Sequence, residues 1–422
     1  MKVWIVFIGE ELPIDGAVRP WRYGILSDIL ADRGHEVIRW QPSFYLHKFQ
    51  RCEADTTIRW RDNYTIRLIH VPPYRRHIGF QRIRHYEILA RRFAALAREE
   101  EPPDILLCGM PSPSMCAASA DYAAQRRIPL LIDVRDLWPD IFLDVVPPLL
   151  RPLGRLALWF EFRRNRRVFR QATGILGIRD DFVQWGRDYG RRAPGAFDGT
   201  FSHAYRERTL SAGERSREEE LLRRAGVRFE HPLACFFGSF EESYDLETVV
   251  EAARELAAGP HRDLQFVLCG DGKKLPALRT RAEGLPNVVL PGRVSPEAIA
   301  RLMESADFGL ASFIRGATHT VSNKVVEYFC GGLAVVASES EGIRRVLEAN
   351  RCGVTYDPEN AGGLAAALAD LLENDGKREE MKRNARALYE RSYTAGAVYG
   401  AMADHLEKTA RSFRAGGERA AP

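Results

Sequence analysis

The sequence has little of what disulfide-linked, zinc-binding and membrane-spanning proteins need. Its seven cysteines are odd in number and form no C-x-x-C pair. Several lie in apolar runs, so buried reduced thiols fit them better than disulfides or zinc, which favours a reducing, cytoplasmic compartment. These cysteines are Cys52, Cys108, Cys116, Cys235, Cys269, Cys330 and Cys352. No histidine has a metal-ligand spacing such as H-E-x-x-H, and we expect neither a metal nor another cofactor.

Long apolar runs are also missing. None reaches the roughly 18 residues that a membrane-spanning helix needs. Residues 1–8 lack the long apolar region and the cleavage site of a signal peptide, and they are expected to form a buried first strand. The formal net charge is only +4, and no known nucleic-acid-binding motif is present, so we expect no nucleic acid partner.

What the sequence does contain is a long alternation of apolar runs and helical patterns. Its 422 residues exceed what one hydrophobic core usually organises, so two domains are expected. Continuous apolar strands between helices indicate parallel βαβ units covered on both faces. Strands are expected at 2–9, 36–40, 65–71, 104–108, 129–134 and 174–178, and then at 233–237, 264–269, 287–290, 308–312 and 334–337. Helices are expected at 20–34, 79–101, 111–126 and 151–172, and apolar stripes indicate two more around 246–256 and 364–372.

These elements predict an α/β protein with two Rossmann-like domains in series. The N-terminal domain covers residues 1–205, a polar and arginine-rich linker covers 206–228, and the C-terminal domain covers 229–392. Residues 393–422 hold the end of a last helix and then a disordered tail from Arg414. That helix, over about 378–413, has too much arginine for a core element. Because ligands bind at the carboxyl ends of such strands, a cleft between the domains is the expected site.

The segment from Arg315 to Ser338 is the most informative one. Ser322 is a suitable N-cap for a helix over 323–330, which Gly331 and Gly332 end before the next strand. The amide groups and the dipole of this helix start could bind a diphosphate. Lys324 opposes the dipole, which suggests an anionic ligand, and Glu327 could accept hydrogen bonds from ribose hydroxyls. From spacing alone, a simple cap with two surface charges remains an equal alternative.

This segment resembles the donor-site signature of glycosyltransferase family 4, whose members are retaining enzymes of the GT-B fold. It is most similar to the branch that builds O-antigen, capsule and exopolysaccharide repeats, which reads roughly P-x-K-x-x-E-Y-x-A-x-G-x-P-V-V. The matching residues are Lys324, Glu327, Tyr328, Gly332 and the pair Val335–Val336. The resemblance implies that Glu327 binds the nucleotide ribose and that the two domains face each other across a cleft.

Further matches follow in the family's order. The segment 133–140, D-V-R-D-L-W-P-D, resembles D-x-R-D-L-W-P-E of the same branch, which implies that Asp136 meets an acceptor or sugar hydroxyl and that Arg135 orders it. A structural ion pair or helix cap is an equal reading of these two residues. Residues 237–239, 270–272 and 292–294 resemble the turns that surround the donor. The implied donor-binding residues are Ser322, Asn323, Glu327, Gly238, Ser239, Gly270, Gly272, Arg293 and Val294.

The chain also departs from the family pattern. His319 stands where the family usually has the first glutamate of an E-x7-E pattern. In the family that glutamate often contacts the donor sugar, so its replacement leaves the identity of the sugar open. The loop 239–245 has none of the cations that usually clamp the diphosphate. In the loop after the first strand, where the family has a Gly-Gly pair, only Gly16 would let the backbone come close to a ligand. Charge neutralisation must then come from the amides of 322–325 and from Lys324, with Arg315 and Lys273 as further candidates.

Two stretches place arginines among apolar residues, over 74–98 and over 149–170. For 74–98 a solvated face is the better reading. Apolar and aromatic side chains beside dense arginine are typical of interfacial helices. For 149–170 an apolar half that covers the sheet, with solvated arginines, is the alternative, but the resemblance favours contact with an anionic membrane, because family members that extend a lipid-linked sugar must reach the membrane surface.

The resemblance therefore implies a retaining glycosyltransferase with Lys324, Asp136 and Arg135 as catalytic residues. It would move a hexosyl or N-acetylhexosaminyl group from a nucleotide-sugar, UDP rather than GDP, to a lipid-linked or oligosaccharide acceptor in surface polysaccharide biosynthesis. Its place would be the cytoplasm, at the inner face of the membrane. The missing clamp cations and His319 leave open a non-catalytic GT-B partner subunit, and a GT-B nucleotide-sugar epimerase is a further alternative.

Overall fold

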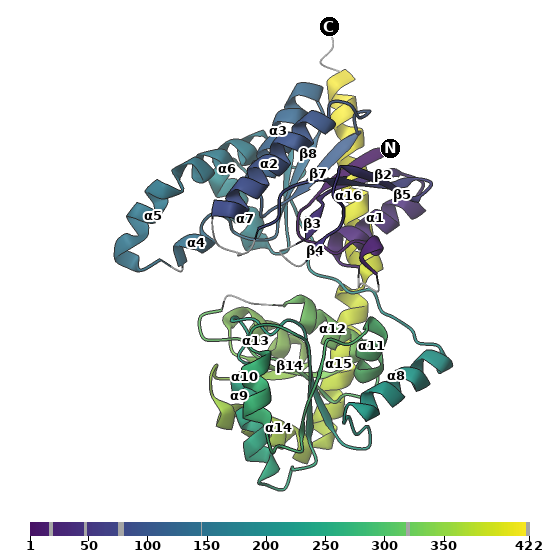
Figure 1. The fold of residues 1–422 in the computed structure, drawn as a ribbon, viewed down its shortest axis with the longest axis vertical. Coiled ribbons are helices and arrows are strands. Elements are labelled where there is room, and N and C mark those ends of the chain that lie inside the picture. Colours follow the sequence, from purple (N-terminus) through teal and green to yellow (C-terminus); the bar gives the residue numbers. More distant parts are fainter. Residues whose placement is uncertain (17–19, 46–48, 75–79, 145, 318–320, 419–422) are drawn as a thin grey trace. The chain divides into compact units, whose positions relative to one another are not determined.

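The computed structural model describes the chain except for residues 17–19, 46–48, 75–79, 145, 318–320 and 419–422. Arg75, Arg76 and His77 of the first basic stretch, and His319, therefore lie outside the described residues. The chain forms two compact units, Met1–Ser202 with Val398–Pro422, and His203–Ala397. Each has its own sheet and its own hydrophobic core (Figure 1).

The first unit is built on an eight-stranded sheet, parallel except for β5, which runs antiparallel to β6. In spatial order its strands are β10 (Gly199–Thr200), β9 (Gly174–Gly177), β8 (Leu130–Val134), β7 (Ile105–Gly109), β1 (Lys2–Val6), β2 (Glu36–Pro42), β6 (Tyr64–Ile69) and β5 (Thr56–Arg61). A small antiparallel pair, β3 (Phe44–Tyr45) and β4 (Phe49–Gln50), stands beside it. The central strands are apolar and buried on both faces, as parallel sheets require.

Helices cover both faces of this sheet. On one face α2 (Phe80–Leu96), α3 (Pro113–Arg126), α6 (Trp159–Gln171) and α7 (Asp180–Gly190) share a core with Trp4 and Trp40, whose rings are 5.1 Å apart. On the other face α1 (Arg22–Asp32) lies with the last helix, α16 (Ala395–Glu418). Arg33, directly after α1, pairs with Asp404 of α16 at 2.7 Å. Short helices η1 (Pro13–Asp15), α4 (Ile141–Asp144), η2 (Pro148–Leu150) and α5 (Arg151–Ala157) complete the unit.

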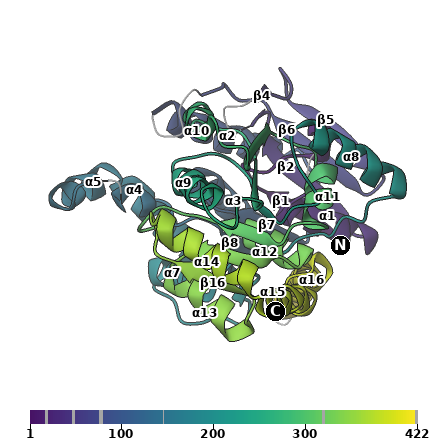
Figure 2. The same cartoon turned by 90° about the horizontal axis from the view of Figure 1, so that it is seen from below.

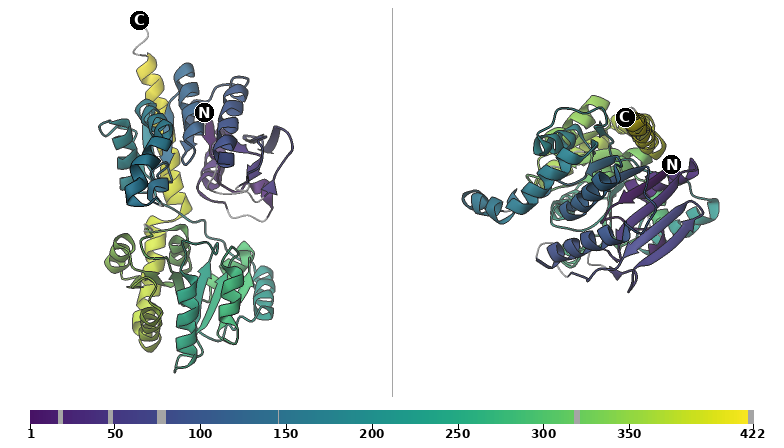
Figure 3. Two further views of the ribbon diagram at one scale, coloured as in Figure 1. Left: turned by 60° about the vertical axis from the view of Figure 1, so that its left-hand side comes forward. Right: turned by 90° about the horizontal axis from the view of Figure 1, so that it is seen from above.

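The second unit has a wholly parallel six-stranded sheet (Figure 3). Its order is β13 (Val288–Gly292), β12 (Gln265–Cys269), β11 (Leu233–Phe237), β14 (Phe308–Ala311), β15 (Ala334–Ser338) and β16 (Gly353–Tyr356). One face packs against α9 (Leu246–Ala257), α10 (Leu275–Ala282) and α14 (Ala361–Glu373). The other packs against α8 (Ala212–Arg224), α11 (Pro296–Met303), α12 (Asn323–Gly331), α13 (Glu341–Asn350) and α15 (Asp375–Ser392).

The expected α/β architecture with two Rossmann-like sheets is confirmed. The strand expected at 233–237 is β11 to the residue, and the stripe expected at 246–256 is the buried face of α9. The stretch 206–228 contains α8, which belongs to the second unit. The edge strands β5 and β16 were not expected from the sequence, because neither is a long apolar run.

Two expected helices are wrong in detail. The helix expected at 151–172 is broken at Leu158 into α5 and α6. The last helix, expected over 378–413 outside the core, is two helices, each with a buried apolar stripe. The break between them has a clear cause: the backbone of Tyr205 bonds to the carbonyl of Tyr393 and to the amide of Ala395. Arginine content was misleading because the arginines occupy the other faces of these helices. The second helix, α16, also continues through residues 414–418 of the expected tail.

Candidate functional site

The start of α12 leaves its first amide groups open. Ser322 occupies the N-cap position in an extended conformation, as expected, but its hydroxyl makes no capping hydrogen bond. That hydroxyl is buried and has no hydrogen-bond partner among the described residues. The first helical bond runs from the amide of Val326 to the carbonyl of Ser322, at 3.1 Å. The helix therefore presents unused donors and the positive end of its dipole, an arrangement that suits an anion.

Lys324 lies in the first turn of α12, with its amine directed to aromatic groups. Its Nζ donates to the hydroxyl of Tyr244 at 2.9 Å and stands 4.1 Å from the centre of that ring. The Phe236 ring is 5.1 Å from the same nitrogen. Among the described residues no carboxylate pairs with Lys324, so its charge is held in place but not neutralised.

Gly238, directly after β11, gives Lys324 this position. Its φ of +150° belongs to the region that favours glycine, and a Cβ atom there would lie 2.1 Å from Nζ of Lys324. Any side chain at residue 238 would displace the amine. The structure thus brings together two of the residues that the sequence singled out, the glycine after β11 and the lysine of α12.

The turns after β11, β12 and β13 lie in a row. The amide of Gly238 bonds to the carbonyl of Cys269, and the amide of Gly270 bonds to that of Gly292, both at 2.9 Å. A Cβ at Gly270 would be 1.8 Å from the Gly238 carbonyl oxygen, and one at Gly272 would be 2.6 Å from that of Phe240. Both glycines are therefore required by the close approach of one backbone to another, whatever ligand the turns bind.

The other cations named from the sequence have different surroundings. Arg315 donates to the carbonyl of Pro358 at 2.7 Å and stands beside the carboxylate of Glu359. Lys273 is exposed. Lys274, which the sequence did not single out, donates to the carbonyl of Tyr244 at 2.8 Å and pairs with Glu247 at 3.0 Å. Lys324 is the one of these four whose amine stands in the Gly238 turn without a carboxylate beside it in the described structure.

Further along α12 the side chains turn inward. Glu327 is 1% exposed, and Tyr328 donates to the carbonyl of Leu310 at 2.9 Å inside the core. Gly309 makes room for the Tyr328 ring, since a Cβ there would lie 2.3 Å from it. Asn323 is half-buried and Ser239 is exposed. Gly332 ends the helix in the left-handed conformation, as expected.

Arg293 and Val294 come directly after the turn at Gly292. They follow β13 and line a hollow of about 380 Å³ against the side of α8. Ser295, the N-cap of α11, donates there to Glu218 of α8 at 2.9 Å.

In the first unit the end of β8 carries a buried ion pair that the sequence did not reveal. The Asp133 carboxylate accepts from Nε of Arg22 at 2.7 Å and from Nη2 at 3.0 Å. It also accepts from the Tyr23 hydroxyl at 2.7 Å. Burial alone would lower the pKa of Arg22, but the Asp133 charge raises it overall. Burial, reinforced by the same carboxylate, raises the pKa of Tyr23 well above its ordinary value, so Tyr23 stays a donor.

Arg135 and Asp136 follow this pair. The Arg135 guanidinium is 5.8 Å from the centre of the Tyr23 ring, and its Nε is buried without a hydrogen-bond partner among the described residues. Asp136 is exposed. The structural ion pair of this segment is thus made by Asp133, and Asp136 is left accessible.

The loop after β1 closes the start of α1. Glu10 is buried and accepts from the amide of Tyr23 at 3.1 Å and from that of Gly24 at 2.9 Å. Arg39 pairs with the same carboxylate at 2.8 Å. Gly16 is exposed, with a φ of +100° and no atom of the described residues within 4 Å of an added Cβ. The anion-binding end of α1 is already occupied by a carboxylate of the chain itself.

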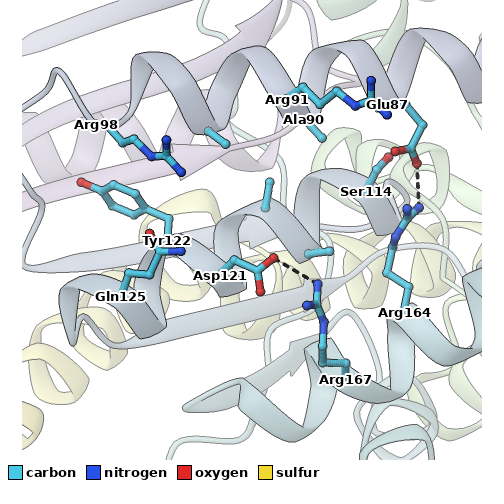
Figure 4. A pocket seen from close by; sticks show the side chains of 13 residues that line it. Glu87, Ala90, Arg91, Arg98, Ser114, Asp121, Tyr122, Gln125, Arg164 and Arg167 are labelled. Atoms are coloured by element: carbon cyan, nitrogen blue, oxygen red, sulfur yellow. Dashed lines mark hydrogen bonds and ion pairs between the residues drawn. The ribbon is translucent and has the colours of Figure 1, made fainter.

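The first unit also has a hollow of about 300 Å³ between α2, α3 and α6 (Figure 4). Its floor is made of alanines, and its rim carries Arg91, Arg98, Arg164 and Arg167. Arg164 pairs with Glu87 at 2.7 Å and Arg167 with Asp121 at 3.1 Å. Its lining residues belong to these helices, except for Arg98 just after α2, and none of the residues expected in the site is among them.

Over the described part of the chain, no cluster of His, Cys, Asp and Glu could hold a metal ion. All seven cysteines are free thiols. Within the same residues, no helix has both the length and the apolar character needed to cross a bilayer.

Comparisons with known proteins agree with two linked domains. Residues 26–195 match the family described as "Glycosyl transferase 4-like domain", and residues 231–374 match "Glycosyl transferases group 1". Alpha-D-kanosaminyltransferase of Streptomyces kanamyceticus is 26% identical over 295 residues, which cover 68% of this chain and 72% of that protein. Phosphatidyl-myo-inositol mannosyltransferase of Mycolicibacterium smegmatis is 31% identical over 144 residues, only 34% of this chain and 36% of that protein.

Solved structures show the fold. HepE of Anabaena in complex with UDP superposes with a TM-score of 0.67, covering 97% of this chain and 100% of that one at 14% identity. Sucrose-phosphate synthase from Thermosynechococcus elongatus gives a TM-score of 0.69 over 96% and 98%. At 14% identity these similarities are evidence for the fold alone, and they confirm the expected GT-B architecture.

Proposed function

Because this chain is a glycosyltransferase with the GT-B fold, we propose that it moves a sugar with retention from a UDP-sugar to a lipid-linked or oligosaccharide acceptor in surface polysaccharide biosynthesis. The sugar is a hexosyl or N-acetylhexosaminyl group. The chain acts at the cytoplasmic side of the membrane as a member of family 4, without a metal or another cofactor. The single observation that carries this proposal is the uncapped start of α12 with the amine of Lys324 over Gly238.

The diphosphate of the donor is the natural ligand of this group. The amides of residues 323–325 and the α12 dipole attract an anion, and Lys324 adds a full charge at the same place. When the sugar leaves, negative charge develops on the diphosphate, and fixed donors there lower the barrier by electrostatic stabilisation. The buried Ser322 hydroxyl is a further donor within reach of the helix start.

The remaining roles follow from position. Glu327 binds the ribose, one turn into α12 from the diphosphate. Arg293 and Val294 border the base beyond the turn after β13. On the first unit, Asp136 meets the acceptor or sugar hydroxyl because it is exposed at the end of β8, and Arg135 orders it from its place over Tyr23. The name of the Mycolicibacterium smegmatis relative gives a phosphatidylinositol lipid as acceptor, which supports a lipid-linked acceptor here, and the UDP held by HepE supports a uridine donor.

The non-catalytic alternative is weakened by what surrounds the loop 239–245. This loop has no cation of its own, but the fold brings Lys324 to the hydroxyl of Tyr244 and Lys274 to its carbonyl. The positive charge that the family supplies from the loop is here supplied by α12. An epimerase is distinguished by its independence of any acceptor.

Titration calorimetry with UDP and GDP, followed by UDP release from a panel of UDP-sugars, tests the proposal. We expect UDP to bind more tightly than GDP, and release to need both a donor and an acceptor. Lys324→Ala should lower kcat by about a hundredfold or more, the usual cost of losing one stabilising donor. Lys377→Ala, which removes an exposed lysine paired with Asp370 on the surface, is the matched control. UDP binding without any turnover would indicate the partner subunit, and donor conversion without acceptor would indicate the epimerase.

A further inference from the structure

The segment 149–160 of the first unit exposes apolar side chains to an unusual degree. Among the described residues twelve large apolar side chains are exposed, and seven of them lie between residues 141 and 160. Leu149 is 94% exposed, Leu153 63% and Leu156 67%. The others of this group are Ile141, Leu150, Trp159 and Phe160. Soluble proteins rarely gather such side chains on one surface unless that surface meets an apolar partner.

The helices that carry these side chains extend away from the body of the first unit. Figures 1 and 2 show α4 and α5 reaching beyond the sheet and the other helices of this unit. Helix α5 packs on α4 through Gly154, where a Cβ would be 3.0 Å from Leu143. Leu153 and Leu156 lie one turn apart on α5. Together with Leu149 before α5 and Phe160 after the break at Leu158, they make up the exposed apolar stripe of this segment.

The charge beside this stripe has one sign. Residues 149–170 contain seven arginines and a single acidic residue, Glu161, and no acidic residue lies between 145 and 160. Arg164 and Arg167 are turned toward the hollow of Figure 4, where they pair with Glu87 and Asp121. The five others, Arg151, Arg155, Arg163, Arg166 and Arg170, are exposed and have no ion-pair partner among the described residues.

We infer that 149–170 is a docking surface for an anionic phospholipid bilayer. The leucines, Trp159 and Phe160 enter the boundary between headgroups and acyl chains, and the five arginines meet the lipid phosphates. Trp159 suits this depth because its indole has an apolar body and a polar N–H group. A protein partner of mixed charge would leave the arginines unmatched, whereas an anionic bilayer matches the apolar stripe and the basic one at once.

Flotation of the full-length chain with vesicles tests this inference. Vesicles of phosphatidylcholine alone are compared with vesicles of phosphatidylcholine and phosphatidylglycerol in equal amounts. We expect binding to the anionic vesicles, weakened by salt, and little binding to phosphatidylcholine. The double variant Leu153→Ser/Leu156→Ser should lower the partition coefficient by at least about tenfold. Arg155→Gln and Arg163→Gln should each lower it by about fivefold.

Matched controls lie in the second unit. Leu221→Ser changes a leucine of α8 that is 51% exposed, and Arg383→Gln removes an exposed arginine of α15. Neither should change vesicle binding. Insertion is read directly with brominated lipid: the quenching of tryptophan fluorescence should be lost in Trp159→Phe.

Two results would overturn the inference. One is a wild-type chain that does not float with anionic vesicles, or whose flotation survives the leucine substitutions. The other is a dimer in light scattering without lipid that the leucine substitutions dissociate, because the stripe would then be covered by a second copy. Titration with UDP is unaffected by either result, so the docking surface and the transferase proposal fail separately.

Discussion

Helices α1 and α12 begin in the same way and end up with different chemistry. Each presents free amides and a positive dipole at its first turn. At α1 the chain supplies its own anion, since Glu10 accepts from two amides and pairs with Arg39. At α12 the Ser322 side chain makes no capping hydrogen bond in the part of the chain that the structure describes, and a lysine stands beside the amides.

A helix start is available to a ligand when the rest of the fold supplies it with neither a capping group nor a counter-charge. The Glu10 carboxylate makes α1 a structural element. The uncapped Ser322 and the unneutralised Lys324 leave α12 able to take a charge from outside. Four substitutions test this difference between α1 and α12.

The largest effect is expected for Glu10→Gln, on stability. The amide side chain keeps its shape but leaves Arg39 buried without its counter-charge, which should lower the free energy of unfolding by about 3 kcal/mol. All seven tryptophans lie in the first unit, so urea unfolding followed by their fluorescence reports on the affected part. UDP affinity should not change. A Glu10→Gln chain that binds phosphate or UDP more tightly would show that α1 is a ligand site after all.

Gly238→Ala should act on the ligand. The added methyl group needs the place of the Lys324 amine, so we expect UDP affinity to fall by about tenfold, equivalent to about 1.4 kcal/mol. Gly16→Ala is the paired variant: it also puts alanine at a positive φ, but in open space. It should cost about 1 kcal/mol of stability through backbone strain and leave UDP affinity unchanged. Equal losses of UDP affinity in both variants would contradict this assignment.

Tyr244→Phe removes the hydroxyl bond to Lys324 and keeps the ring beneath its charge. A hydrogen bond of about 1 kcal/mol corresponds to a roughly fivefold lower kcat, with donor KM little changed. Tyr356→Phe removes a buried hydroxyl bond to Ser312 in the same unit, 2.7 Å long, and serves as the control. It should change stability and leave kcat as it is. Unchanged kinetics in Tyr244→Phe would mean that the ring alone positions the lysine.

The smallest change is expected for the stability of Ser322→Ala. An N-cap serine that makes its hydrogen bond typically contributes about 1 kcal/mol. Ser211, which accepts from the amide of Glu214 at 3.2 Å, should lose that amount on substitution by alanine. Ser322 makes no such bond, so its loss should stay below about 0.5 kcal/mol while UDP affinity falls severalfold. Thermal unfolding followed by circular dichroism compares the two, and a larger loss for Ser322→Ala would mean that it caps α12.

What the sequence predicts here is local. The strand β11 and the buried stripe of α9 follow from patterns within a dozen residues, and the end of α12 follows from two glycines. The contacts that shape the candidate site are not local. Lys324 meets Tyr244 across 80 residues, and Arg22 meets Asp133 across 111. No spacing rule relates such residues, because the order of the strands decides which turns become neighbours.

The helix expected over 378–413 shows a different kind of error, in which a correct local observation led to a wrong conclusion about burial. Its arginines lie mostly on α15 and were a true observation about the surface of that helix, but they hid the apolar stripe made by Met381, Ala385, Leu388 and Tyr389. Composition averages over all faces of a helix, and burial depends on one face only.

Because α16 packs on the first unit, the two units cannot complete their folding in the order of the sequence. Residues of α16 hold Arg33 and His35, and Tyr399 lies under Arg22, so the first unit lacks part of its own packing until α16 has been synthesised. The second unit is a continuous segment, His203–Ala397, whose residues have all left the ribosome earlier. The domain encoded second is therefore the one able to complete its folding first.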